Sequence, residues 1–275
     1  MTGLGNGPLG PQSALAQAVA VRDRGTMAMV KAAVQHRNVL LAYQPIVQAG
    51  RPDKIAYYEG LIRVLDETGR IIPAKDFIDA VEESETGRML DCIALEKGLV
   101  ALSRVPDLRL AINMSARSIG YRRWMRLLTR ALDRNPTIGE RLILEITETS
   151  AMLVPELVVS FMAGLRDRGI AFAIDDFGAG YTAFRYFRDF QFDILKIDGQ
   201  FIQGIARDPD NQVLTRAMVA IAQQFDMFSV AEKVERDEDA RFLTQIGVDC
   251  LQGFYFGAPT VRPPWEDQPR NKISA

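Results

Sequence analysis

The sequence predicts an α/β fold, a (β/α)8 TIM-like barrel with an irregular opening β-hairpin. From residue 108 to 252, apolar strand-like runs alternate with segments of helical spacing, a pattern typical of a parallel sheet with helices outside it. Two earlier strand-like runs, at 40–47 and 55–64, are separated by the turn sequence GRPDK, which favours a hairpin. Acidic residues recur where the strand-like runs end. In barrels of this kind the chemistry lies at the carboxyl ends of the strands.

The 275 residues fit one large domain with short ends. Residues 1–24 are rich in glycine and proline, and we expect a flexible N-terminal lead there, with weak helical character from Ser13 to Val21. A short helix over 26–35 opens the barrel domain, which we expect to span 25–260. The proline-rich sequence 261–275 predicts an irregular C-terminal tail.

Within the barrel domain, helical segments have apolar residues at steps of three and four, as at Leu90, Ile93 and Ala94. The expected helices are 73–83, 87–104, 116–134, 155–168, 181–188, 210–225 and 236–246. The expected strands of the alternating part are 108–113, 141–147, 170–175, 193–197, 227–232 and 248–252.

Composition excludes several classes of function. The net charge is −2, so no broad basic surface for DNA or RNA is indicated. The only histidine is His36, which argues against a histidine metal site or a Ser-His-Asp triad. Cys92 and Cys250 are far apart and indicate neither a zinc site nor a disulfide framework. No run reaches the roughly 18 apolar residues of a membrane span, and the N-terminus is no secretory signal. We therefore expect a cytoplasmic protein.

The strand ends predict a metal site. A carboxylate at the end of a buried strand is costly unless it is paired, hydrogen-bonded or bound to metal. Four strand ends offer oxygen ligands, from Glu59, Asn113, Glu145 and Asp175. Oxygen is the ligand atom that Mg²⁺ and Mn²⁺ prefer. Asp176 follows Asp175 directly, so the pair could hold two ions, although these two residues alone also suit a strand-to-turn segment.

Two further inward candidates complete the predicted chemistry. A lysine such as Lys196 beside the attacking water can hold the nucleophile, and a carboxylate such as Glu232 can accept its proton. Two ions roughly 3.5–4 Å apart activate a water and neutralise a phosphoryl oxygen. The predicted reaction class is metal-assisted phosphodiester hydrolysis. Glu148 and Glu235, taken singly, are better explained as solvated or capping residues.

From Leu40 to Pro259 the chain resembles the EAL-domain cyclic di-GMP phosphodiesterases. The resemblance rests on eight motifs in order: YQPI (43–46), EGLIR (59–63), NMS (113–115), EITE (145–148), DDFGAGY (175–181), LKID (195–198), AEKVE (231–235) and QGFYF (252–256). The activity implied by the resemblance is hydrolysis of cyclic di-GMP to linear pGpG with two Mg²⁺ or Mn²⁺ ions, which Ca²⁺ would inhibit.

The resemblance also implies roles for individual residues. The implied metal ligands are Glu59, Asn113, Glu145, Asp175, Asp176 and Glu232, with Asp175 bridging the ions. The implied catalytic residues are Lys196, Glu232 and Glu59. The implied substrate contacts are Gln44, Arg63 and Asp198. The implied supporting residues are Glu148, Glu235 and Gln252. Glu148 would anchor the loop from Phe177 to about Tyr186, and a homodimer would form through that loop and the neighbouring helix.

The chain departs from the family pattern at several positions. Gly60 replaces the usual alanine, and we expect a looser strand without loss of Glu59. Lys233 replaces a glycine and would be strained if its φ must be positive. Its ammonium would also compete with metal if it reached Glu232. The loop carries milder changes at Ala179, Thr182, Ala183 and Phe184.

Two other functions stay open. A catalytically weak or inactive domain could serve as a cyclic di-GMP receptor or as a protein-interaction scaffold, which Lys233 would favour. The same barrel and metals would also permit hydrolysis of another nucleotide. No cyclase, receiver or sensor motif precedes residue 25, so we expect no attached input domain in this chain.

Overall fold

The computed structural model describes residues 14–180 and 187–266. Its strands are β1 (Val39–Gln48), β2 (Arg51–Leu65), β3 (Ile71–Pro73), β4 (Leu110–Asn113), β5 (Leu142–Thr147), β6 (Ala171–Phe177), β7 (Ile194–Ile197), β8 (Phe228–Ala231) and β9 (Cys250–Gln252). Its α-helices are α1 (Ala14–Gln35), α2 (Ile78–Val81), α3 (Glu85–Arg104), α4 (Arg122–Arg134), α5 (Glu148–Leu153), α6 (Pro155–Arg166), α7 (Pro209–Gln224) and α8 (Asp237–Gln245). Short 3₁₀ helices are η1 (Ala74–Asp76), η2 (Ala116–Ser118), η3 (Pro136–Arg141) and η5 (Ile205–Arg207).

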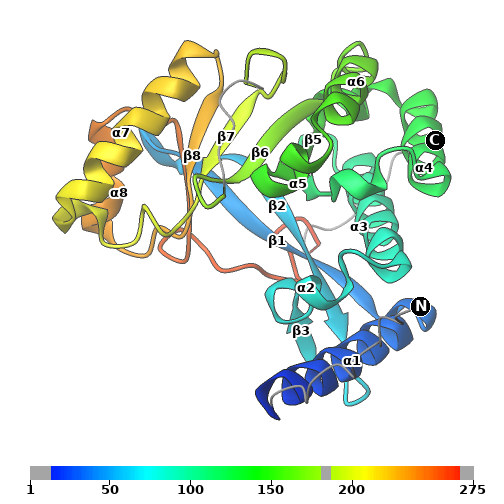
Figure 1. The fold of residues 1–275 in the computed structure, drawn as a ribbon. Helices are drawn as coiled ribbons and strands as arrows, with labels where there is room; N and C mark the ends of the chain where they lie inside the picture. The colour runs from blue at the N-terminus through cyan, green and yellow to red at the C-terminus, as the bar shows by residue number, and fades with distance from the viewer. Residues whose placement is uncertain (1–13, 181–186, 267–275) are drawn as a thin grey trace, which may run out of the picture.

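The strands form a closed barrel with the helices outside it (Figure 1). The sheet order is β1-β9-β8-β7-β6-β5-β4-β2-β3, and pairing of β1 with β2 closes the ring. Strand β1 runs antiparallel to both β2 and β9, whereas the pairs from β2 through β4 to β9 are parallel. The predicted barrel with an opening hairpin is therefore confirmed. Strand β3 extends the sheet beyond the barrel by pairing with the end of β2.

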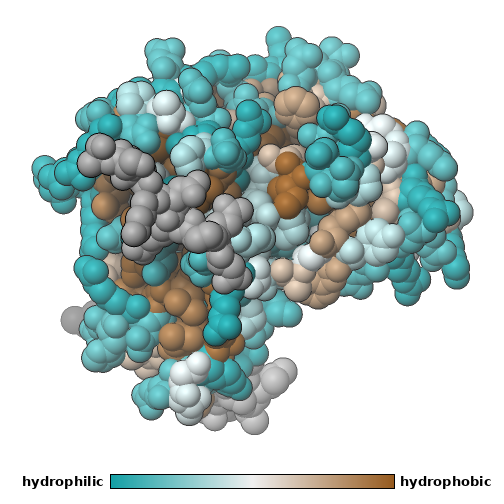
Figure 2. Space-filling model, turned by 180° about the vertical axis from the view of Figure 1, so that it is seen from behind, coloured by the Kyte–Doolittle hydropathy of each residue, from teal (hydrophilic) through white to brown (hydrophobic). Residues whose placement is uncertain are grey.

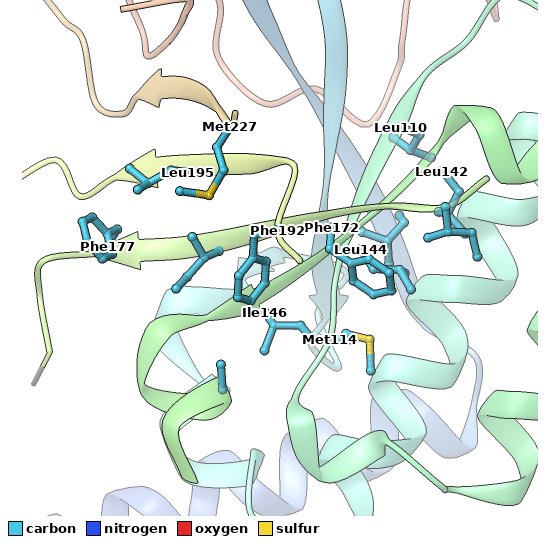
Figure 3. Close-up of a cluster of buried hydrophobic side chains, with 14 of the residues drawn as sticks. Leu110, Met114, Leu142, Leu144, Ile146, Phe172, Phe177, Phe192, Leu195 and Met227 are labelled. Carbon is cyan, nitrogen blue, oxygen red and sulfur yellow. The ribbon is translucent and has the colours of Figure 1, made fainter. Parts of the chain in front are cut away.

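The main hydrophobic core lies between the barrel wall and the surrounding helices. Figure 3 shows part of it, where Leu144 and Phe172 from neighbouring strands lie close to Met114. The buried helix residues Trp124, Leu128 and Leu132 belong to the same cluster. The strands of the parallel part are apolar on both faces because this core covers their outer side while the barrel interior covers the other.

A second core holds α1 against the outer ends of the first strands. It joins Val30 and Val34 of α1 to Val64 of β2, Ile72 of β3 and Leu90 of α3. The helix begins at Ala14, well before the predicted start at 26, so residues 14–24 of the expected flexible lead are helical. The alanine-rich sequence explains the extension, because alanine has the highest helix propensity. Residues 1–13 lie outside the described part.

Two predicted helices are interrupted. The segment 73–83 divides into η1 and α2 at Phe77, whose φ of −144° is not helical. The segment 116–134 divides into η2 and α4, because Gly120 takes a left-handed φ of 78° between them. The short helix α5, directly after β5, is not among the predicted elements. Most of the helix predicted at 181–188 lies outside the described residues.

The described part of the tail is irregular and packs on the barrel. The Trp265 ring meets the rings of Tyr43 and Tyr58 edge-on, with centroid distances of 5.0 and 4.8 Å. Residues 267–275 lie outside the described part. The division of the chain into lead, barrel and tail otherwise stays a prediction.

Hydrophilic side chains cover most of the periphery seen from behind in Figure 2, and hydrophobic surface gathers in patches nearer the middle of that face. Across the described ranges, no helix combines the length and the apolar character that crossing a bilayer requires.

Two glycines offer a matched test of this packing. A methyl group at Gly139 would overlap the Arg168 carbonyl oxygen, a backbone atom that cannot turn aside, whereas Gly164 in α6 has nothing within 4 Å. We expect Gly139→Ala to lower the free energy of unfolding by about 1–3 kcal/mol. Gly164→Ala should raise it by up to about 1 kcal/mol, because glycine is a poor helix former. Urea denaturation measures both changes, and a stabilised Gly139→Ala variant would contradict the packing described.

Candidate metal centre

Each of the eight barrel strands contributes one apolar side chain to a layer inside the barrel. This layer is Ile46, Tyr57, Ala111, Ile143, Ala173, Ile194, Val230 and Cys250. A polar residue stands two positions away from each of them. Seven of these polar residues lie within the same strand, Gln44 and Glu59 in its middle, and Glu232 directly follows β8: Gln44, Glu59, Asn113, Glu145, Asp175, Lys196, Glu232 and Gln252. Side chains alternate between the two faces of a strand, so residues two apart share a face. We call these eight residues the polar ring, and the sequence predicts all of them as site residues.

The centre of the polar ring is the Lys196 ammonium. Its Nζ lies 2.8 Å from Glu232 Oε1, 2.9 Å from Asp175 Oδ1, 3.0 Å from Glu145 Oε2 and 3.5 Å from Glu59 Oε2. The Lys196 side chain is 1% exposed. Strand alternation thus brings carboxylates from four separate strands around one buried cation.

Amide groups complete the network on the other side of Glu59. Asn113 Nδ2 donates to Glu59 Oε1 at 2.7 Å, and Gln252 Nε2 donates to Glu59 Oε2 at 2.6 Å. Gln252 Nε2 also lies 3.1 Å from Gln44 Oε1, and Gln44 in turn donates to the Gly257 carbonyl. All eight residues of the polar ring are therefore linked in one network.

The polar ring holds more negative than positive charge. Four buried carboxylates face one ammonium. Burial raises the pKa of Glu145 and of Glu232 well above the usual range, and the neighbouring carboxylates add to the rise. Burial alone would lower the pKa of Lys196, but the carboxylates raise it well above its usual range, so the ammonium keeps its proton. Glu59 differs: Lys196 and the amide donors outweigh burial and hold its pKa below the usual value.

A break in strand alternation turns a second aspartate toward the site. Asp176 has a left-handed φ of 53°, and the pairing of β6 with β7 is irregular between Ile174 and Phe177. Bulges of this kind re-aim side chains and are frequent beside functional sites. Burial, together with Asp175 and Asp198, raises the pKa of Asp176 to about 6. Adjacent residues of a regular strand point to opposite faces, but the left-handed backbone at Asp176 lets it lie beside Asp175 and feel its negative charge.

The oxygen atoms fit two hard divalent cations. Ligand atoms of Glu59, Glu145 and Asp175 lie within 4.8 Å of one another, and so do those of Asp175, Asp176 and Glu232. The two groups share Asp175. Glu145 Oε1 is buried without a hydrogen-bond partner among the described residues, as an oxygen that awaits a cation would be. An all-oxygen donor set with excess negative charge suits Mg²⁺ or Mn²⁺ rather than softer metals.

The remaining predicted residues lie around the ring. Glu148 is buried, and its Oε2 accepts from the Gly178 backbone N–H at 2.9 Å, at the start of the loop that follows β6. Arg63 is partly buried on β2 and donates to the Ile62 carbonyl. Glu235 is exposed, and across the described ranges it has no hydrogen bond or ion pair. Glu148 thus contacts the start of the loop, as the resemblance implied, whereas Glu235 does not contact the polar ring. The predicted loop residues 182–184 lie outside the described part.

The two main departures from the family pattern have clear physical outcomes. Lys233 has a φ of 53°, which is the strained backbone expected for a lysine in a glycine position. Its ammonium lies 3.4 Å from Asp198 Oδ2, so it pairs with Asp198 rather than with Glu232. At Gly60, an added methyl group would lie 2.8 Å from Ile112 Cδ1. Ile112 therefore fills the space that an alanine would need, and the strand stays packed.

One half-buried carboxylate close to Asn113 is absent from the predicted set. Asp91 of α3 accepts from the Ser115 backbone N–H at 3.1 Å and from Ser118 Oγ at 2.6 Å. Burial raises its pKa to about 7. These bonds hold the segment that directly follows Asn113 against α3. Asp91 lies within a regular helical pattern, where a single acidic residue gives no signal of burial.

Comparison with known proteins shows which family this chain resembles. The model of the EAL domain family matches residues 27–259. The signaling protein YkoW of Bacillus subtilis is 30% identical over 84% of this chain and 29% of its own length. The cyclic di-GMP phosphodiesterase PdeB of Shewanella oneidensis is 29% identical over 82% of this chain and 27% of its own length. The chain thus spans less than a third of these two relatives.

The fold also matches solved structures. The PaMucR phosphodiesterase in complex with c-di-GMP superposes with a TM-score of 0.76 at 29% identity. The match covers 88% of this chain and 99% of that one.

The charge imbalance of the polar ring predicts opposite effects of two substitutions. In the presence of a chelator, we expect Lys196→Met to lower the free energy of unfolding by about 3–5 kcal/mol, because it leaves buried carboxylates unpaired. Glu145→Gln should raise stability at pH 8. The raised pKa means that folding disfavours the ionised Glu145 carboxylate, so stability falls as pH rises above about 4.5. Urea denaturation of both variants in EDTA tests this, and a destabilised Glu145→Gln would contradict it.

The backbone at Lys233 predicts a gain in stability. Lys233→Gly should raise the free energy of unfolding by up to about 1 kcal/mol, because glycine adopts a φ of 53° without steric cost. Lys233→Ala keeps a Cβ and serves as the control, with no comparable gain. Thermal and urea denaturation measure the difference, and equal stabilities for the glycine and alanine variants would show that the strain is absent.

Proposed function

This chain belongs to the EAL domain family, and on that premise we propose that it is a phosphodiesterase that hydrolyses cyclic di-GMP to linear pGpG. The observation that carries the proposal is the polar ring with its two groups of oxygen ligands that share Asp175. Relatives that are described as cyclic di-GMP phosphodiesterases, or solved with that dinucleotide, support the choice of substrate.

We propose that Glu59, Asn113, Glu145 and Asp175 hold a first Mg²⁺ or Mn²⁺ ion, and that Asp175, Asp176 and Glu232 hold a second. When bound, the two ions would activate a water and neutralise a phosphoryl oxygen. For Asn113 the amide oxygen would be the ligand, since its Nδ2 is already used by Glu59. The residues of the ring supply the rest of the chemistry.

Lys196 and Glu232 act on the attacking water. Lys196 keeps its proton because carboxylates surround it, so it can donate to the water and hold it in place. Glu232 Oε1 lies 2.8 Å from Lys196 Nζ, so this carboxylate is placed to accept a proton from the water that Lys196 holds. The water oxygen bonds to phosphorus, one P–O bond of the cyclic diester breaks, and the water proton passes to Glu232. The ribose oxygen that leaves phosphorus takes a proton from solvent and remains part of the linear product. Glu59 stays ionised through its low pKa and fixes the amides of Asn113 and Gln252.

Gln44, Arg63 and Asp198 are the proposed substrate contacts. Arg63 is half-buried on β2, where a guanidinium suits a phosphate oxygen. Gln44 and Asp198 are nearly buried and offer hydrogen-bond acceptors for guanine N–H groups.

Glu148 would act indirectly, by holding the segment that starts at Gly178. We propose a homodimer through that loop and the neighbouring helices α5 and α6, whose exposed apolar side chains include Leu153 and Leu157.

Turnover of cyclic di-GMP tests the proposal. Purified protein should produce pGpG with Mg²⁺ or Mn²⁺, measured by chromatography. Glu59→Ala should abolish the product, and Glu232→Gln should lower kcat by about 100-fold or more, because the proton acceptor is lost. The exposed Glu96 on α3 lies away from the ring, so Glu96→Gln should leave the rate unchanged and serves as the control.

Folding of each variant is checked by circular dichroism. Wild-type protein that binds cyclic di-GMP without forming product would overturn the enzyme and leave a receptor. Protein that hydrolyses a different dinucleotide in preference would overturn the substrate. If folded Glu59→Ala still hydrolysed cyclic di-GMP, the proposal that the polar ring is the catalytic site would be wrong.

A further inference from the structure

Lys233 occupies an exposed position beside the polar ring. It directly follows Glu232, and its side chain is 56% exposed. Its backbone is left-handed, with φ 53°, which a residue with a Cβ adopts only at a steric cost. Strained residues of this kind gather at functional sites, so an observed outlier is a reason to ask what the side chain does.

The neighbouring chain makes room for the lysine. A methyl group on Gly199 would collide with the Cβ, Cγ and Cδ atoms of Lys233. The aliphatic part of Lys233 therefore lies over Gly199, and this contact directs the ammonium toward Asp198. Position 199 must stay without a side chain for Lys233 to lie where it does.

The partner of the ammonium is held more firmly than the ammonium itself. Asp198 Oδ1 accepts from the Gln200 backbone N–H at 2.8 Å, and the Asp198 side chain is only 10% exposed. Lys233 Nζ stands 3.4 Å from Asp198 Oδ2. A long, half-solvated pair of this kind contributes little to stability. The ammonium is thus free to exchange Asp198 for a stronger anionic partner.

We propose that Lys233 is a substrate-positioning residue that binds a phosphate of the cyclic dinucleotide and, in doing so, releases Asp198 Oδ2 to accept from a guanine N–H. The inference rests on the proposed function. A phosphate carries a full negative charge, and lysine binds it as a mobile point charge. After this exchange Lys233 contacts a phosphate and Asp198 contacts a guanine of the same bound dinucleotide. It also explains how a lysine can stand next to Glu232 without blocking it.

Binding without turnover is the direct test. We would measure the Kd of cyclic di-GMP by isothermal titration calorimetry in Ca²⁺, with wild type, Lys233→Met and Lys233→Arg. Methionine keeps the aliphatic stem and the Cβ but removes the charge. Lys233→Met should weaken binding about 5- to 20-fold and reduce its dependence on ionic strength. Lys233→Arg should restore most of the affinity. In Mg²⁺, KM should rise for Lys233→Met while kcat stays within about twofold.

Two controls separate a phosphate contact from a general effect of charge. Lys54 is another exposed lysine beside an aspartate, Asp53, at the amino end of β2, and Lys54→Met should leave the Kd unchanged. Gly199→Ala should weaken binding in the wild-type background, because it displaces Lys233. The same substitution in a Lys233→Gly background should have no further effect.

Unchanged or tighter binding by Lys233→Met would overturn the inference, because the lysine would then only screen Asp198. A Gly199→Ala effect that persists in the Lys233→Gly background would overturn the role given to Gly199. Wild-type protein that does not bind cyclic di-GMP at all would instead overturn the proposed function, and this inference with it.

Discussion

One buried ammonium organises the functional end of this barrel. Lys196 meets carboxylates from β2, β5, β6 and the end of β8. The cation neutralises only part of their charge, which is why the oxygens remain available to metals. Glu59 connects this group to the amides of Asn113 and Gln252, so the network reaches around the whole barrel.

The network depends in turn on closure of the barrel. The antiparallel strand β1 joins β9 to β2, and its Gln44 lies opposite Glu59 in the register. Period-two alternation then sets an apolar layer below and a polar ring above. At Asp176 the alternation fails, and that single left-handed residue gives the site one more carboxylate than regular strands could supply.

The sequence predicted the positions of site residues where side chains follow the two-residue alternation of a strand. Polar residues that end apolar runs, such as Glu145 and Asp175, could be placed on the rim because strand alternation and barrel topology fix their direction. Other features depend on contacts that no local pattern contains. Asp91 accepts from the Ser115 backbone N–H because α3 packs against the segment that follows Asn113. The sequence predicted that Lys233 would be strained if its φ were positive. The direction of its long side chain could not be predicted, because it depends on contact with Gly199, which is distant in sequence.

The unbalanced charge of the polar ring also bears on how such a site persists through evolution. Replacing Glu145 or Glu232 by a neutral residue would relieve repulsion, so substitutions that remove these two proposed ligands would stabilise the fold. Loss of these two carboxylates would leave the barrel intact, whereas loss of Glu59 would remove the partner of the Asn113 and Gln252 amides.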